Sequence, residues 1–230
     1  MKLVTWNCNQ AFRKKQHQLL KLEPDIAAVP ECENPAEKGD WSEFTDWWWT
    51  GDNPNKGIGV FTRNGIEVTN TTEIVEADHF LHVETGIMDV LAVWTVNNKE
   101  HPRQRYISQA YTALENNPEL VNENTVVAGD FNWNVMWDES PNSPLCGNLG
   151  DVQRKLNQYG LYSAYHAVSG NEFGEETEAT FYMHKKEERP YHIDYAFVPR
   201  ELMDSDVDLM VGEYHNWIEA SDHVPLLVTF

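Results

Sequence analysis

Basic residues are scarce in this sequence: 17 lysines and arginines stand against 37 acidic residues, a formal net charge of −20. This balance argues against the broad basic surface with which proteins usually follow a nucleic acid backbone. It still permits a small phosphorylated substrate, or a nucleic acid held by metal ions and a few local cations. Such cations occur at 13–15, at 103 and 105, and at 185–186, although solvated surface explains each equally well.

Long apolar runs are also absent. No stretch approaches the roughly 18 uninterrupted apolar residues that a membrane-spanning helix requires, and the mean hydropathy is −0.57. The first residues read as a strand and lack the features of a signal peptide. We therefore expect a cytoplasmic protein without a membrane span.

Cysteine is rare, with Cys8, Cys32 and Cys146 as the three examples. Three cysteines in a chain of this size do not form a disulfide framework, so a reducing compartment is expected. Cys8 and Cys32 each lie beside a candidate site residue. A zinc site there is the weaker alternative to buried thiols, because no Cys-x-x-Cys pair or matched histidine spacing accompanies them.

Linkers, repeats and low-complexity segments are missing, which predicts one domain over residues 1–230. The chain opens with a predicted strand (3–8), amphipathic helix (13–22) and buried strand (25–30). Further strands are predicted at 57–62, 66–69, 72–75, 80–84, 88–96, 125–129, 161–165, 179–183, 192–198 and 224–230, and helices at 103–116 and 149–159. Two mixed sheets with helices on both outer faces would bury all these runs, so we expect an α/β fold, a four-layer α/β/β/α sandwich.

Two segments are expected to be loops. Residues 33–54 contain Trp41 and three consecutive tryptophans at 47–49, and residues 169–178 are strongly acidic. The tryptophans suit either packing of the loop or stacking on a base or ring. We favour packing, because most aromatic area in proteins is core area.

Five short polar motifs lie at the ends of predicted strands. They are Trp-Asn-Cys-Asn (6–9), Pro-Glu-Cys (30–32), Gly-Asp-Phe-Asn (129–132), His-Ile-Asp-Tyr (192–195) and Ser-Asp-His (221–223). Each has an ordinary explanation alone: Asn7 as a cap, Glu31 as a surface carboxylate, Gly129 with Asp130 as a turn. Together, from both halves of the chain, they indicate one convergent site.

The residue types in these motifs suit a hard divalent cation, Mg²⁺ or Mn²⁺. Such cations prefer oxygen ligands and typically use one or two carboxylates plus substrate phosphate. Glu31 is the first candidate ligand, and Asp222 completes the set, with Asp130 and Asn132 contributing directly or through water. His223 qualifies as a general base if a carboxylate fixes its tautomer, and Asp194 is the expected carboxylate.

The ordered motifs resemble the endonuclease/exonuclease/phosphatase superfamily, which includes exonuclease III type abasic-site enzymes and deoxyribonuclease I type nucleases, over essentially the whole chain. The resemblance implies that Asn7 helps order the metal and phosphate and that Glu31 binds Mg²⁺, with Asp222 near the metal. It further implies roles for the remaining residues: Asp130 orients or deprotonates the attacking water, Asn132 holds the phosphate, and His223, paired with Asp194, contacts phosphoryl oxygens or transfers a proton. Which of Asp130 and His223 is the base stays open.

The chain departs from the family pattern in places. The strand at 93–96 has no histidine where many relatives carry one, and Pro30 stands where abasic-site enzymes have glutamine. His192 replaces a common arginine. Tyr106 matches a tyrosine of the abasic-site enzymes and is either a phosphate contact or a helix-packing aromatic, with His101 a weaker substitute.

The resemblance implies a divalent-metal-dependent phosphoesterase in which water attacks phosphorus in line, with a nuclease acting on DNA or RNA as the first choice. A phosphatase or phosphodiesterase of a small phosphorylated metabolite or lipid headgroup is the alternative, and fits the acidic composition better. A catalytically silent binding module on the same fold is a third. The expected partner is a phosphate-ester substrate, nucleic acid included, without an obligate protein partner.

Overall fold

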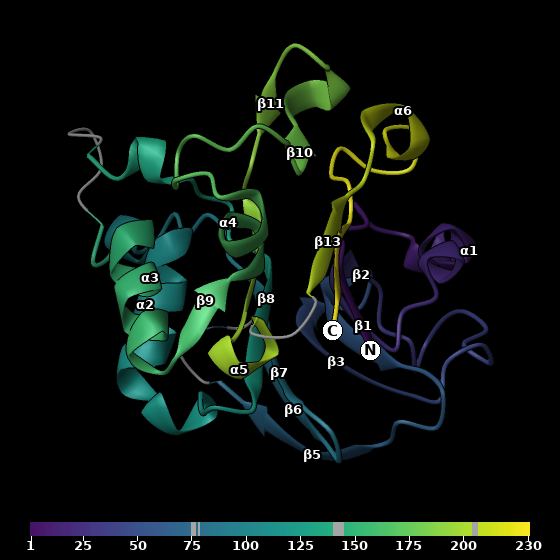
Figure 1. Ribbon diagram of the computed structural model, residues 1–230. Helices are drawn as coiled ribbons and strands as arrows, with labels where there is room; N and C mark the ends of the chain where they lie inside the picture. The colour runs from purple at the N-terminus through teal and green to yellow at the C-terminus, as the bar shows by residue number, and fades with distance from the viewer. Residues whose placement is uncertain (75–76, 78, 140–144, 204–206) are drawn as a thin grey trace.

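Two six-stranded mixed β-sheets lie face to face in the computed structural model, which describes residues 1–74, 77, 79–139, 145–203 and 207–230 (Figure 1). The strands are Lys2–Thr5 (β1), Ile26–Cys32 (β2), Asp46–Asn53 (β3), Lys56–Thr62 (β4), Val68–Glu73 (β5), Phe80–Thr85 (β6), Asp89–Trp94 (β7), Thr125–Asp130 (β8), Leu161–Ser163 (β9), Phe181–Tyr182 (β10), Pro190–Tyr191 (β11), Asp194–Pro199 (β12), Asp208–Val211 (β13) and Leu226–Thr229 (β14). One sheet has the order β13-β14-β1-β2-β4-β3 and the other β5-β6-β7-β8-β12-β9, while β10 and β11 form a separate hairpin.

Helices cover the outer faces of both sheets. The α-helices are Gln16–Leu19 (α1), Ile107–Asn116 (α2), Leu149–Gln158 (α3), Ala164–Ser169 (α4), Arg200–Met203 (α5) and Tyr214–Trp217 (α6), and the 3₁₀ helices are Phe12–Lys14 (η1), Leu20–Leu22 (η2), Pro102–Gln104 (η3), Pro118–Leu120 (η4), Val135–Trp137 (η5) and Met183–Lys185 (η6). In Figure 1, α2 and α3 flank the sheet that contains β8, and α1 and α6 lie beyond the other sheet. The predicted four-layer α/β/β/α sandwich is confirmed.

Alternation along β7 explains why this strand is apolar throughout. Val90, Ala92 and Trp94 join the core between the sheets, whereas Leu91 and Val93 pack in the second core against α2 and α3. Successive side chains of a strand point to opposite faces, so a strand covered on both faces needs an unbroken apolar run. The longest apolar runs recognised in the sequence, such as those of β2, β7 and β8, are therefore inner strands of the two sheets.

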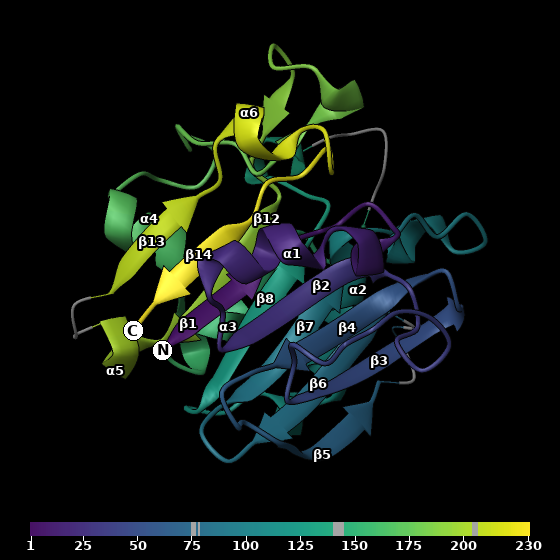
Figure 2. The same cartoon turned by 90° about the vertical axis from the view of Figure 1, so that its right-hand side faces the viewer.

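The expected strand, helix and strand at the start of the chain form a crossover in which β1 and β2 are parallel (Figure 2). The helix predicted at 13–22 is instead three short helices, η1, α1 and η2. The Glu33 carboxylate accepts hydrogen bonds from the backbone N–H of Phe12 (2.6 Å) and Arg13 (3.1 Å). Glu23 then ends the segment in the left-handed conformation (φ 54°). These tertiary constraints break the periodic helix that the sequence indicates.

The prediction that residues 33–54 form one loop is wrong for 46–53, which form β3 beside β4. Tryptophan favours strands, but three in a row hide the alternation that marks one. Trp41 lies in the remaining loop and is buried, with its ring 5.6 Å from that of Phe12 and 5.2 Å from that of Phe61. Packing is thus the role of Trp41.

Other differences concern short elements. The strand predicted at 161–165 ends at Ser163, and Tyr165 lies in α4. The strands predicted at 66–69 and 72–75 are one strand, β5, and residue 75 lies outside the described residues. The elements α5, β13 and α6, each four residues long, were not predicted. Each has at most one buried residue, so none carries a clear apolar pattern.

Candidate active site

Strand direction brings the polar motifs to one edge of the sandwich. The parallel strands β1 and β2 end at the same edge, which places Asn7 beside Glu31. In the facing sheet, β12 runs antiparallel to β8, so Asp194 at the start of β12 pairs with Asp130 at the end of β8. Likewise β14 is antiparallel to β1, so the segment that leads into β14 brings His223 to the same edge.

Asn7 joins carboxylates from the two sheets. Its side-chain nitrogen donates to Asp130 Oδ2 (2.8 Å) and to Glu31 Oε1 (3.3 Å), and the residue is 1% exposed. Its side-chain oxygen accepts the backbone N–H of Asn9 at 3.0 Å. The amide nitrogen of Asn7, rather than its oxygen, therefore faces the two carboxylates.

Asn132 holds the other side of Asp130. Its backbone N–H donates to Asp130 Oδ1 (2.8 Å), and its side-chain nitrogen donates to Asp130 Oδ2 (2.9 Å) and to the carbonyl of Thr95 (2.9 Å). This geometry requires a left-handed backbone at Asn132 (φ 48°), which asparagine tolerates better than most residues. Asp130 is thus an oriented carboxylate with no exposed surface.

Glu31 is presented by an irregularity of β2. The pairing of β2 with β4 shifts register between Pro30 and Cys32, and Glu31 has a φ of 62°. Bulges of this kind re-aim a side chain and are frequent beside active sites. The Glu31 carboxylate accordingly reaches both Asn7 and Lys56, whose Nζ lies 3.2 Å from Glu31 Oε2.

His223 lies between two buried carboxylates. Its Nδ1 is 2.9 Å from Asp194 Oδ2, and its Nε2 is 3.9 Å from Asp130 Oδ2. The Thr180 hydroxyl oxygen accepts the backbone N–H of Asp194, and the Phe181 ring lies 4.6 Å from the imidazole. The Asp194 contact fixes the orientation of the ring, as the sequence led us to expect of this pair.

Ser221 fixes the backbone that leads to His223. Its hydroxyl donates to the carbonyl of Asn7 (2.7 Å) and accepts the backbone N–H of His223 (3.0 Å). Trp6 Nε1 adds a bond to the carbonyl of His223 at 3.1 Å. The two ends of the chain are thereby locked together directly behind the site.

Burial and the neighbouring charges shift both titrating groups. Burial raises the pKa of the Asp130 carboxyl to about 7, with an opposing effect from His223 and a further rise from Asp194. Burial also lowers the pKa of His223, but the carboxylates of Asp194 and Asp130 outweigh it and raise the value to about 10. The two neighbouring carboxyl groups thus favour the protonated form of His223, and burial favours the neutral form of Asp130.

The donor set fits a divalent cation. Ligand atoms of Asp130, Asp194 and His223 lie within 4.8 Å of one another. Asp194 Oδ1 is buried without a hydrogen-bond partner in the part of the chain that the structure describes. Glu31 adds a carboxylate that is 18% exposed and joined to Asp130 through Asn7. Oxygen donors are the ligands that Mg²⁺ and Mn²⁺ prefer.

The sequence profile of the Endonuclease/Exonuclease/phosphatase family matches residues 4–223, nearly the whole chain. The chain belongs to this family. Membership supports a phosphoesterase activity, and the family is typically dependent on divalent metals. A comparison with curated proteins gave no match.

Solved structures of the family share the fold. An AP endonuclease from Archaeoglobus fulgidus superimposes with a TM-score of 0.72 at 17% identity, over 100% of this chain and 99% of the other. A 3′-5′ exonuclease from Neisseria meningitidis gives 0.74 at 19%, over 100% and 99%. A 3′ phosphatase from Neisseria, bound to a product DNA hairpin, gives 0.76 at 18%, over 100% and 99%. At these identities the likeness shows the fold alone.

Two of the predicted family residues make other contacts. The Oδ1 of Asp222 accepts the side-chain nitrogen of Asn9 at 2.9 Å, and its charge acts on the adjacent His223. Tyr106 precedes α2 with a φ of 48°, and its ring lies 6.2 Å from that of Trp133. Metal binding by Asp222 and phosphate binding by Tyr106 stay predictions.

His192 is buried under the acidic loop. Its Nδ1 bonds to the carbonyl of Glu178 at 2.7 Å, and burial lowers its pKa. His101 is exposed. Of the local cations, Lys15 donates to the carbonyls of Cys8 and Asn9 and so supports the first motif.

The cysteines beside the site are buried free thiols. Burial raises the pKa of Cys8 and of Cys32 well above the ordinary value. A thiol is a poor metal ligand until it is deprotonated. This agrees with the interpretation of both residues as buried thiols.

Sequence reasoning missed Lys56 and Asn9. Asn9 is the last residue of the Trp-Asn-Cys-Asn motif (6–9), and its place in that motif was the signal that could have identified it. Lys56 lies 25 positions from Glu31, and nothing in the sequence connects them. Only the pairing of β2 with β4 brings the two side chains together.

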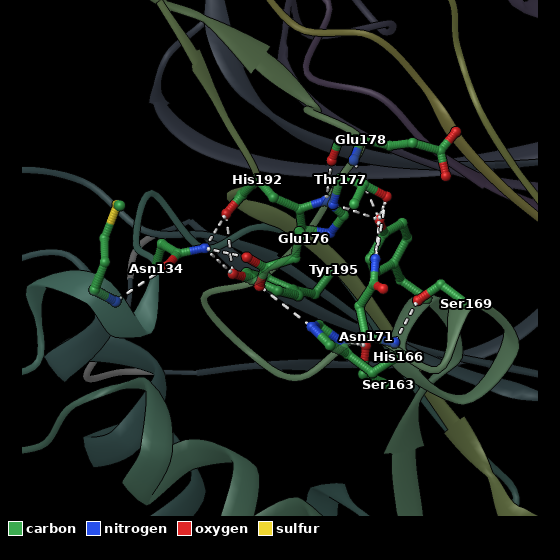
Figure 3. A network of polar contacts seen from close by, with 12 residues as sticks. Asn134, Ser163, His166, Ser169, Asn171, Glu176, Thr177, Glu178, His192 and Tyr195 are labelled. Carbon is green, nitrogen blue, oxygen red and sulfur yellow. Dashed lines mark hydrogen bonds and ion pairs between the residues drawn. The ribbon is translucent and has the colours of Figure 1, made fainter.

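An acidic cavity of about 450 Å³ opens beside the site. It adjoins the site through Tyr182, whose backbone N–H donates to the carbonyl of Asp222 at 2.8 Å. Its lining includes four glutamates, Glu176, Glu178, Glu187 and Glu213. In Figure 3, Glu176 lies in a polar network with Asn134 and His166 (3.1 and 3.2 Å). The carboxylates in its lining disfavour the binding of phosphate groups there.

Helices of the described ranges are all too short or too polar to cross a membrane. This agrees with the prediction of no membrane span, as far as the structure describes the chain.

Proposed function

We propose that the chain hydrolyses phosphodiester bonds of DNA or RNA by metal-assisted, in-line attack of water on phosphorus. The observation that carries the proposal is the meeting of Asn7, Glu31 and Asp130 with the His223–Asp194 pair at one edge of the sandwich. A nuclease is our first choice because similar structures include an AP endonuclease and an exonuclease.

Each side chain has a part that follows from its contacts. Glu31 would hold Mg²⁺ or Mn²⁺ with Asp222 nearby, and the bound cation would neutralise charge on the phosphoryl and leaving oxygens. Asp130, oriented by Asn7 and Asn132, accepts a proton from the attacking water. His223, aligned by Asp194, donates a hydrogen bond to a phosphoryl oxygen. The amides of Asn7 and Asn132 already donate both of their N–H groups, so each would exchange one present partner for a phosphoryl oxygen in the reacting complex.

The direct test uses Glu31→Ala and His223→Ala. Removing a group that stabilises the transition state typically lowers the rate by about 10²- to 10³-fold, so both variants should lose nearly all Mg²⁺- or Mn²⁺-dependent hydrolysis. Glu119→Ala and His17→Ala, which change exposed residues of the same types, serve as controls. Near-normal turnover by either site variant, with folding verified by circular dichroism, would contradict the assignment.

A second candidate is a phosphatase or phosphodiesterase of a small phosphorylated molecule. The net charge of −20 and the four glutamates of the neighbouring cavity favour it, because both disfavour a long polyanion. A panel of nicked, abasic, single-stranded and RNA substrates, set against bis-p-nitrophenyl phosphate and sugar phosphates with and without EDTA, separates the two. Hydrolysis of small esters alone would eliminate the nuclease.

A further inference from the structure

Lys56 places an ammonium group at the mouth of the site. Its Nζ lies 3.2 Å from Glu31 Oε2 and 4.9 Å from the centroid of the Trp94 ring. The Lys56 side chain is 36% exposed, so it is open to solvent on one side. Lys56 comes from one sheet and Trp94 from the other, and the ammonium bridges the two sheets.

The backbone around Lys56 is well fixed. Lys56 opens β4 and pairs with Asn53 of β3, and the next residue, Gly57, pairs with Cys32 just after the Glu31 bulge. A Cβ on Gly57 would lie 2.3 Å from the carbonyl oxygen of Thr50, so the strands approach closely here. The backbone of Lys56 is therefore rigid, whereas the four methylene groups of its side chain allow the ammonium to move.

Trp94 anchors the ammonium near the reacting groups. It is 4% exposed and ends β7 directly opposite Asp130 in the parallel pair. A lysine ammonium within about 6 Å of a tryptophan ring is attracted by the electron-rich face of that ring. If the ion pair between Lys56 and Glu31 broke, the attraction to Trp94 would keep the Lys56 ammonium close to the site.

Glu31 has two competing cationic partners. Glu31 would hold a divalent cation through its carboxylate, and the added positive charge would repel the Lys56 ammonium a few ångströms away. A phosphate ester that reaches the same cation brings negative oxygens to the place that the ammonium vacates. The Lys56 ammonium could therefore pair with Glu31 before the divalent cation binds and with a phosphate oxygen afterwards.

We propose that Lys56 is an exchangeable counter-ion that neutralises Glu31 before the divalent cation binds and afterwards binds a nonbridging oxygen of the substrate phosphate. The second half of this proposal rests on the proposed phosphoesterase function. Lys56 would then be a phosphate-binding residue supplied by the sheet opposite Asp130.

The first test is a calorimetric titration with Mn²⁺ of the wild type, Lys56→Met and Lys2→Met. Lys2 is the matched control, because it forms a 3.1 Å ion pair with Glu23 and is 35% exposed. Loss of the competing ammonium should tighten Mn²⁺ binding by about three- to tenfold in Lys56→Met, the range expected for a partly exposed ion pair and a like charge. Lys2→Met should match the wild type. Unchanged or weaker Mn²⁺ binding by Lys56→Met would overturn the exchange.

The second test titrates inorganic phosphate into the protein in excess Mg²⁺. Lys56→Met should bind phosphate at least about tenfold more weakly than the wild type, and Lys56→Arg should stay within about threefold, because charge-assisted contacts to phosphate are strong and arginine retains the charge. Equal phosphate affinity in Lys56→Met and the wild type would overturn the second role.

Failure of this proposal is distinct from failure of the proposed function. If the wild type hydrolyses no ester, the two titrations still report on Lys56. If the wild type is an active enzyme but Lys56→Met keeps both affinities, Lys56 is only a surface partner of Glu31 and the phosphoesterase assignment stands.

Discussion

Gly129 shows how a single residue makes room for the site. A Cβ at this position would lie 1.8 Å from the carbonyl oxygen of Val93, and the residue has a φ of 153°. Gly129 lies inside β8, as the strand predicted at 125–129 requires, at a point where β7 and β8 approach closely. Glycine is needed here because any side chain would separate the strand that carries Asp130 from its neighbour.

We expect Gly129→Ala to lower the free energy of unfolding by about 3 kcal/mol or more, the range of severe overpacking in a core. Denaturant unfolding measures this loss. Gly86→Ala is the control, because a Cβ there has no neighbour within 4 Å among the described residues and should leave stability unchanged. An equally stable Gly129→Ala variant would show that the strands can separate without cost.

At the scale of elements, the acidic loop between α4 and β10 is held by a buried carboxylate (Figure 3). The Glu176 side chain is 4% exposed and accepts hydrogen bonds from His166 and Asn134. Burial alone would raise the pKa of Glu176, but these bonds and backbone N–H groups lower it from 4.5 to about 2. The loop predicted at 169–178 is therefore anchored to the sandwich by one of its own acidic residues.

The stability that Glu176 contributes is present above its unfolded pKa and disappears as pH falls toward the folded value. Between pH 7 and about pH 3, the wild type should lose about 2 kcal/mol more stability than Glu176→Gln, by proton linkage. Denaturant unfolding at the two pH values measures the difference. Glu178→Gln, an exposed change in the same loop, should behave as the wild type. Equal pH dependence in wild type and Glu176→Gln would show that Glu176 titrates normally.

The sequence predicted where strands lie along the chain better than it predicted which strands pair with each other. The apolar runs of β1, β2, β7, β8 and β12 marked their elements, and the polar residues at their ends marked the candidate site. Elements that bury a single residue, such as β13 and α6, carry too little apolar pattern to be recognised. The pairing of β2 with β4, which brings Lys56 to Glu31, is a long-range choice that local sequence does not encode.

The whole molecule carries a net charge of −20, and its acidic groups repel one another across the surface. Salt screens this repulsion. We expect the melting temperature, measured in EDTA, to rise by about 2–4 °C between about 20 mM and about 500 mM NaCl, which corresponds to about 1 kcal/mol in a domain of this size. A fall in the melting temperature would mean that surface ion pairs outweigh the repulsion.

The sequence by itself determined the layers, because unbroken apolar runs must be covered on both faces, and it determined which residue types could do chemistry. Only the tertiary structure decided which oxygen or nitrogen faces which: that Asn7 turns its amide nitrogen to Glu31 and Asp130, and that Asp222 contacts Asn9. The reason is physical. Burial patterns are repeated locally along the chain, whereas hydrogen-bond partners are fixed by strand pairing and packing between residues far apart in sequence.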